Sequence, residues 1–260
     1  MIVRIAHLSD IHFGGELTQA TEAALKAVAD FDPTVVAVTG DLTLNGLPRE
    51  FRAARDWLSR LGRPTVVTPG NHDTPYWNLP LRALRPFERY ERYIGPAVGA
   101  AYDAPHVSVR ALNSARGAQP RFDWSKGAIA LDKLRRIQWG TGARVFACHH
   151  PLMDLAGAPV TGGVRGGVLA GALLAEAGVE LVLTGHVHVP FAAPLTVAPP
   201  ICYAIGAGTL SRRLRGAPAS YSTIAVTQEA FEVTVQAWTG EHFQTQQSWR
   251  LARASSLELG

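Results

Sequence analysis

Five clusters of aspartate, asparagine and histidine lie between positions 10 and 188, and each follows a run of apolar residues. They are Asp10 with His12, Asp41, Asn71 with His72, His149 with His150, and His186 with His188. Imidazole nitrogens and carboxylate or amide oxygens are groups that bind zinc, iron and manganese in proteins. A single cluster of this kind is more often a turn or a buried polar pair, so the recurrence is what indicates a metal site.

The apolar runs before these clusters have the length and the β-branched content of buried strands. Strands, some with the turn that follows them, are expected at residues 2–8, 34–40, 64–73, 144–151 and 180–188. Helical spacing of apolar residues alternates with them, at residues 18–31, 49–62, 125–140 and 166–179. Because an open α/β sheet binds ligands at the carboxyl ends of its strands, the five clusters are expected to meet in space.

From about residue 194 the pattern changes to consecutive strands with alternating side chains. An α/β core followed by strands predicts a second sheet packed against the first. No linker and no repeat of fixed period interrupts the chain, so we expect one domain over residues 1–252 and a frayed tail over 253–260.

A pair of divalent ions about 3.5–4 Å apart needs an anion from the protein between them, and a carboxylate such as Asp41 is suitable. Three of the clusters follow directly on a glycine, at Gly40, Gly70 and Gly185. Since glycine has no Cβ, it permits the tight turn and the close approach of backbone that a crowded centre requires.

The motifs D-x-H at 10–12, G-D at 40–41, G-N-H-D at 70–73, H-H-P at 149–151 and G-H-x-H at 185–188 together resemble the signature of the calcineurin-like metallophosphoesterases. Within that superfamily, the short chain and the opening HLSDIH resemble bacterial class III cyclic-nucleotide phosphodiesterases and glycerophosphodiesterases. The resemblance implies an α/β (α+β) fold, a four-layer αββα sandwich of two mixed β-sheets flanked by helices.

The resemblance also implies a role for each matching residue. Two divalent or transition-metal ions (manganese, iron or zinc) are expected. One would be bound by Asp10, His12 and His188, the other by Asn71, His149 and His186, with Asp41 between them. His149 is preferred to His150 because the family's ligand stands two positions before the proline.

The remaining site residues have expected roles in binding and catalysis. His72 is expected to contact the phosphate and to protonate the leaving oxygen, and Asp73 to orient His72. Asn71, His72 and His150 are the expected substrate-binding residues, with His150 acting at the site or by packing beside it.

The reaction expected from this site is hydrolysis of a small phosphodiester, of cyclic nucleotide or glycerophosphodiester type, by water or hydroxide held at the ions. Alternatives are a pyrophosphohydrolase of a nucleotide-sugar or lipid precursor, a phosphomonoesterase, and a non-catalytic scaffold of the same fold. A nuclease is disfavoured, because the chain has no basic stripe with interleaved aromatic residues and no specific nucleic-acid surface is evident.

The composition of the chain limits the classes of substrate and cellular location that we expect. The formal net charge is +4, and a mildly positive field favours a small anionic phosphoester as substrate. Only three of the 25 basic residues are lysine, and the abundant arginines are interpreted as solvated surface residues. No stretch approaches the roughly 18 apolar residues of a membrane span, and two cysteines are too few for a disulfide scaffold, so a cytoplasmic protein is expected.

Other residues of the sequence have more than one interpretation. The aromatic residues of segment 74–99 are candidates for a substrate platform, for the core or for a homodimer surface: Tyr76, Trp77, Phe87, Tyr90 and Tyr93. Four arginines are candidates for a second phosphate or for ordinary surface positions: Arg82, Arg85, Arg116 and Arg165. The glycine-rich loop 154–167 is a candidate lid or a connector.

Overall fold

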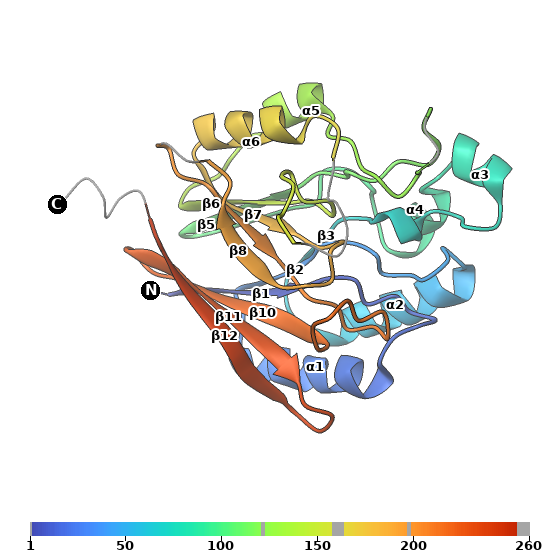
Figure 1. Ribbon diagram of the computed structural model, residues 1–260, viewed down its shortest axis with the longest axis horizontal. Helices are drawn as coiled ribbons and strands as arrows, with labels where there is room; N and C mark the ends of the chain where they lie inside the picture. The colour runs from blue at the N-terminus through green and yellow to red at the C-terminus, as the bar shows by residue number, and fades with distance from the viewer. Residues whose placement is uncertain (1, 121–122, 158–163, 197–198, 254–260) are drawn as a thin grey trace.

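The computed structural model describes residues 2–120, 123–157, 164–196 and 199–253. Its strands form two six-stranded mixed sheets (Figure 1). The first has the order β12-β11-β10-β1-β2-β3, with β1 (Val3–Leu8), β2 (Val35–Val38), β3 (Thr65–Val67), β10 (Ser220–Val226), β11 (Ala230–Trp238) and β12 (Phe243–Ala252). The second has the order β4-β5-β6-β7-β9-β8, with β4 (Ala101–Ala104), β5 (Val107–Ala111), β6 (Ala143–Ala147), β7 (Val179–Thr184), β8 (Phe191–Pro194) and β9 (Tyr203–Gly206).

Both sheets combine a parallel half with antiparallel additions. In the first, β1, β2 and β3 are parallel, whereas β10, β11 and β12 are added antiparallel beside β1. In the second, β5, β6, β7 and β9 are parallel, and β4 and β8 form antiparallel edges. The prediction that the strands after residue 194 form a second sheet of their own is therefore wrong. Strand β9 belongs to the second sheet, whereas β10, β11 and β12 belong to the first.

Alternation of side chains along the central strands produces the layers. In β1 and β2, Ile5 and Val35 face the space between the sheets, while Ala6 and Val36 face outward against helices. In β6, Val145 faces inward and Phe146 faces the helices on the other side. Three apolar cores result, one between the sheets and one under each helical layer. The structure is the four-layer αββα sandwich, as expected.

The helical layers form where the sequence has an apolar stripe. Helix α1 (Thr18–Phe31) and helix α2 (Pro48–Arg60) cover the first sheet, and Trp57 of α2 donates its indole N–H to the carbonyl of Thr21 at 2.9 Å. Helix α5 (Leu131–Arg135) and helix α6 (Gly167–Glu176) cover the second (Figure 1). Two short helices, α3 (Leu79–Leu84) and α4 (Glu88–Tyr93), lie beyond β3, with α4 against α2.

The helix expected over residues 125–140 is shorter, because only Leu131–Arg135 is helical. The segment before it is tied to its neighbours by its backbone: Ala128 donates its N–H to the carbonyl of Ser114, and Gly127 accepts from Arg165. These long-range bonds hold the segment in a non-helical conformation, with a β-bridge between Ala128 and Arg165, and no local periodicity could indicate them. Residues 158–163 of the glycine-rich loop and 254–260 of the expected tail lie outside the described residues. None of the described helices has the length and apolarity to cross a bilayer.

Candidate metal centre

The carboxyl ends of β1, β2, β3, β6 and β7 meet at one edge of the sandwich, and the five clusters follow these strands. The structure brings all seven expected ligands together there, almost without exposure to solvent. They are Asp10, His12, Asp41, Asn71, His149, His186 and His188, none more than 7% exposed. Convergence of side chains from positions 10 to 188 is what the pattern of strands predicted.

One group of ligand atoms surrounds Asp10 and His188. Asp10 Oδ1 lies 3.0 Å from His188 Nε2, and His12 Nε2 lies 3.3 Å from the same nitrogen. Asp41 Oδ2 is 3.7 Å from His12 Nε2. Four candidate ligand atoms thus lie within 4.8 Å of one another, a spacing that suits a single cation.

A second group lies on the other side of Asp41. Asn71 Oδ1 is 3.2 Å from His149 Nε2 and 3.1 Å from His186 Nδ1. Asp41 Oδ2 is 3.4 Å from His149 Nε2, so the oxygen that faces His12 also faces this group. One carboxylate oxygen between two sets of ligands is the arrangement expected of a bridge between two ions.

Backbone carbonyls orient three of the imidazoles. Nδ1 of His12, His149 and His188 lies 3.2, 2.7 and 2.7 Å from the carbonyl oxygens of Thr43, Thr39 and Arg213 respectively. A carbonyl only accepts, so each Nδ1 carries a proton and each Nε2 faces the centre. This is the support that metal-binding histidines usually have.

Asp10 provides a direct test of whether the site fits a cation. Its Oδ2 accepts from the backbone N–H of His186 at 2.9 Å, whereas its Oδ1 is buried and has no hydrogen-bond donor among the described residues. A buried carboxylate oxygen without a donor is costly unless a cation neutralises it. The donor set and this unpaired oxygen both fit a metal ion.

Electrostatics prepare the ligands for metal binding. Burial lowers the pKa of His12 and His186 to about 3, so both imidazoles are neutral at pH 7. Burial raises the pKa of Asp41, but His149 and His72 beside it outweigh burial and hold the pKa well below its usual range. Burial also lowers the pKa of His149, but Asp41 outweighs burial and raises that pKa to about 9. Without a metal the ring is therefore protonated at pH 7, and a bound cation would displace this proton.

The backbone at the ligands is strained. Seven of the described non-glycine residues have positive φ, and five of these are expected ligands: Asp10 (54°), His12 (51°), Asp41 (49°), His186 (71°) and His188 (62°). Left-handed conformations of such residues cost free energy and persist where the surroundings fix them, typically at functional sites. The positive φ values direct the five side chains toward the same place, and they lower the conformational stability of the turns.

Comparison with known proteins agrees with this geometry. Residues 3–190 match the sequence profile of the calcineurin-like phosphoesterases. The chain belongs to this family. It is therefore a metal-dependent phosphoester hydrolase, and the family uses two metal ions.

Individual relatives of this phosphoesterase support the assignment. A probable cyclic nucleotide phosphodiesterase from Synechococcus sp. is 27% identical over 204 residues, which cover 74% of this chain and 75% of the relative. The glycerophosphodiester phosphodiesterase GpdQ of Enterobacter lignolyticus is 31% identical over 80 residues, only 26% of this chain and 29% of that protein. The crystal structure of purple acid phosphatase PPD1 from yellow lupin matches the whole chain and 55% of its own length, with a TM-score of 0.64 at 13% identity, and so shares the fold.

Asp73 has other contacts than predicted, whereas His150 has the packing contacts that were one of its two predicted roles. Asp73 does not orient His72: its carboxylate accepts from the backbone of Leu42, Thr43 and Gly70. It therefore fixes the turn after β2 against η1 (Asn71–Asp73), because its buried oxygens are used by backbone donors.

His150 forms, with His149 and His186, a group whose ring nitrogens are close enough to hold one cation, but both nitrogens of His150 have other partners. Its Nδ1 is 2.8 Å from Ser114 Oγ, and its Nε2 is 2.7 Å from the carbonyl of Ser125. The ring is buried, and it joins the metal-binding loop to the segment around Ser125. His149 is the histidine of the pair that faces Asp41, as expected.

His72 stands at the edge of the centre with both ring nitrogens in contact. Nδ1 is 2.7 Å from the carbonyl of Leu44, and Nε2 is 2.7 Å from Nη1 of Arg213. Because the carbonyl only accepts and the guanidinium only donates, the proton is on Nδ1 and Nε2 is the acceptor. Burial, assisted by the charge of Arg213, lowers the pKa of His72, in agreement with a neutral ring.

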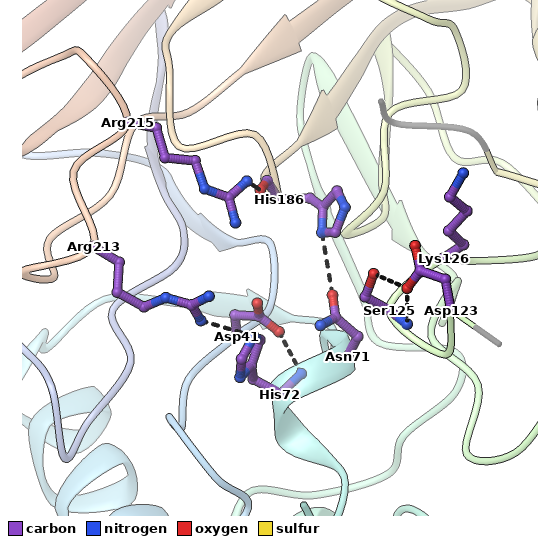
Figure 2. A pocket seen from close by; sticks show the side chains of 9 residues that line it. All are labelled: Asp41, Asn71, His72, Asp123, Ser125, Lys126, His186, Arg213 and Arg215. Carbon is purple, nitrogen blue, oxygen red and sulfur yellow. Dashed lines mark hydrogen bonds between the residues drawn. The ribbon is translucent and has the colours of Figure 1, made fainter. Parts of the chain in front are cut away.

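A cavity of about 350 Å³ opens above the centre (Figure 2). Asp41, Asn71, His72 and His186 form its floor, and two walls rise on either side: Arg213 with Arg215, and Asp123 with Ser125 and Lys126. Sequence reasoning missed the five wall residues. One signal was available in S-R-R-L-R over 211–215. In an extended segment alternate side chains share a face, which places Arg213 and Arg215 on the same side.

The arginines considered from the sequence lie elsewhere. Arg82 is buried and donates to the carbonyl of Gly117, Arg85 lies 3.8 Å from Glu88, and neither Arg116 nor Arg165 lines the cavity. Among the aromatic candidates, Tyr90 is in the core and Phe87 and Tyr93 pack against it. Tyr76 and Trp77 are exposed, 47% and 75% respectively, and do not line the cavity.

Metal removal is expected to lower the melting temperature. Without cations the buried carboxylates of Asp10 and Asp41 lose their neutralising partners, and a ligand at 100 times its Kd contributes about 2.7 kcal/mol. In a chain of this size that corresponds to a Tm change of about 5–10 °C. Thermal melting with EDTA and after return of manganese, zinc or iron measures it. Asp10→Asn should abolish most of the metal-dependent shift and Asp56→Asn should retain it; an equal shift in both would contradict the assignment.

Proposed function

We propose that this phosphoesterase hydrolyses small phosphodiesters of the cyclic nucleotide or glycerophosphodiester type. The observation that carries the proposal is the cavity above the centre, which has a wall on each side of the floor. A diester carries its organic part on two of the four phosphate oxygens, and the space between the two walls can hold that part beside the phosphate. Its volume of about 350 Å³ is in the lower range of small-molecule sites. The name of the Synechococcus relative supports the same class.

In the proposed mechanism, Asp10, His12 and His188 would hold one ion and Asn71, His149 and His186 the other, with Asp41 between them. Bound ions of this kind supply an activated water at neutral pH and neutralise the oxygens of the phosphate. The protein contributes a rigid ligand set, because carbonyls fix the rings and buried apolar strands fix the turns. Manganese, iron and zinc all suit the mixed nitrogen and oxygen donors.

His72 is proposed to act next to the phosphate. Since its Nε2 accepts from Arg213, the arrangement favours a role in orienting the guanidinium over the direct protonation of the leaving oxygen expected from the sequence. The ring of His72 packs edge-on against His12 with centroids 4.8 Å apart, but its nitrogens contact no candidate metal ligand. Its loss therefore removes a packing contact of His12 and no ligand atom, and the ions should stay in place.

His72→Ala is expected to lower kcat about 10-fold with the metal content unchanged, a loss no larger than that expected for the guanidinium of Arg213 that it orients. The loss should be similar for aryl esters with good and with poor leaving groups, because a positioning residue does not protonate the leaving oxygen. Steady-state kinetics with metal analysis measures it, and His106→Ala, an exposed histidine away from the site, is the control. A loss that grows steeply as the leaving group worsens would instead assign the proton transfer to His72.

A substrate series tests the proposed function. Bis-aryl, mono-aryl and cyclic phosphates, with a nucleotide-sugar pyrophosphate, are compared with manganese, zinc and iron supplied in turn. The proposal requires the highest kcat/KM on a diester. A preference for the mono-aryl phosphate or the pyrophosphate would replace it by one of the two alternative reactions.

A further inference from the structure

We propose that Arg213 and Arg215 form an oxyanion subsite that binds the non-bridging oxygens of the reacting phosphate. The inference rests on the proposed reaction and adds the residues that select its charged group. Both arginines follow the last candidate metal-binding motif and lie outside the segment 3–190 that matches the family profile, so that match does not reach them.

The segment 209–215 is fixed to the metal-binding loops. Thr209 Oγ1 donates to the carbonyl of Asp10 at 2.6 Å, and the carbonyl of Arg213 lies 2.7 Å from Nδ1 of His188. Side chains along the segment alternate: Arg212 and Leu214 are exposed, whereas Arg213 and Arg215 are half-buried and line the cavity. The backbone therefore serves the metal ligands while two side chains face the substrate.

Each of the two guanidinium groups has one hydrogen-bond partner in the described part of the chain. Arg213 Nη1 donates to His72 Nε2 at 2.7 Å, and Arg215 Nη1 donates to the carbonyl of His186 at 2.9 Å. Neither forms an ion pair with a carboxylate of the described residues, unlike Arg110 with Asp103 or Arg253 with Glu180. Since a guanidinium carries five N–H donors, most of its donors remain for a ligand.

The placement of these donors fits phosphate. In Figure 2 the two guanidinium groups lie on one side of the cavity, Arg213 beside His72 and Asp41, and Arg215 beside His186. One guanidinium therefore lies next to Asp41 and His72 and the other next to His186. A phosphate bound at the candidate centre would have its non-bridging oxygens within reach of both. Planar N–H pairs match the spacing of phosphate oxygens and form charge-assisted hydrogen bonds.

The subsite has a consequence for selectivity. A phosphomonoester dianion carries one more negative charge than a diester and gains more from each guanidinium. Removal of the arginines is therefore expected to weaken binding of inorganic phosphate and of monoesters more than binding of diesters.

The test uses the metal-loaded full chain and the variants Arg213→Met, Arg215→Met and the double variant, with Arg212→Met as the matched control. The inhibition constant of inorganic phosphate is expected to rise about 10-fold in each single variant and about 100-fold in the double variant, as for lost hydrogen bonds to a charged group. KM should rise more for 4-nitrophenyl phosphate than for bis(4-nitrophenyl) phosphate. Metal content should be unchanged, because Arg213 supports His188 through its backbone carbonyl and Arg215 contacts His186 at the carbonyl and not at the ring.

Arg213→Lys keeps the charge without the planar fork and should recover part of the phosphate affinity. The proposal is overturned if the double variant equals Arg212→Met in phosphate inhibition and in both ester reactions. It is equally overturned if the double variant loses metal in proportion to activity, which would assign the arginines to metal retention. A wild-type preference for another ester class would end the diester proposal and leave the phosphate measurement unaffected.

Discussion

Asp41→Ala is expected to abolish hydrolysis and to remove the metal pair from the protein. Asp41 Oδ2 is the ligand atom shared by both groups, 3.7 Å from His12 Nε2 and 3.4 Å from His149 Nε2. Its other oxygen accepts from the backbone N–H of His72 at 2.8 Å, so the side chain also holds the cavity floor. Loss of residues that merely support a ligand costs 10–100-fold, and loss of a shared ligand should reduce kcat/KM by about 1,000-fold or more.

Metal analysis of the dialysed protein and kcat/KM on a bis-aryl phosphate measure this effect. Asp41→Asn keeps the shape and one oxygen acceptor but removes the charge, and it should retain less than half of the wild-type metal. Asp56→Ala, an exposed carboxylate paired with Arg55, should match the wild type in both measurements. Full metal content with undiminished hydrolysis in Asp41→Ala would end the assignment of a bridged pair.

The convergence of the seven candidate ligands could be predicted because their signal in the sequence is local and repeated. Each cluster follows an apolar run with the length and β-branched content of a buried strand. Parallel strands bring their carboxyl ends to one edge of the sheet. Burial of Ile5 and Val35 between the sheets and of Ala6 and Val36 under the helices shows the alternation that the layers require. The family resemblance then assigned each ligand to an ion, and the contacts of Asp41 with both groups agree with that assignment.

The cavity walls could not be predicted in the same way. Arg213 and Arg215 are two of many arginines, and their position depends on the hydrogen bond of Thr209 to Asp10, a contact across 199 positions. The opposite wall at Ser125 is held by the buried ring of His150, and the backbone bonds of Gly127 and Ala128 to Arg165 and Ser114 replace the expected helix there. Contacts of this range leave no periodicity in the sequence, so such residues become visible only in the fold.

Asp73 shows a different limit. A carboxylate two positions after a ligand and beside a histidine is consistent with orienting that histidine, and the sequence favoured this interpretation. In the structure its oxygens accept backbone N–H groups of Leu42, Thr43 and Gly70, while burial and the charge of Asp41 raise its pKa to about 7. Its contribution is to the shape of the turns that carry Asp41 and Asn71.

Gly70→Ala is expected to be nearly as damaging as loss of a ligand, although it changes no chemical group. A Cβ at Gly70 would overlap both the side chain and the backbone nitrogen of Asp41. The backbone of Gly70 has φ −104°, which alanine adopts without strain, so the effect is steric. The turns after β2 and β3 must separate, which costs about 1–3 kcal/mol and displaces Asp41 from both ligand groups.

The expected result is a loss of metal together with a fall in kcat/KM of about 100-fold or more, since displacement of a catalytic group by even about 1 Å costs rates of that order. Gly171→Ala is the matched control, because its Cβ would meet only the flexible side chain of Leu195, at 3.3 Å or more, in the middle of α6. That substitution should preserve metal and activity. Normal metal content in Gly70→Ala would mean that the two turns can separate without moving Asp41. The close packing of the turns would then not be required for metal binding.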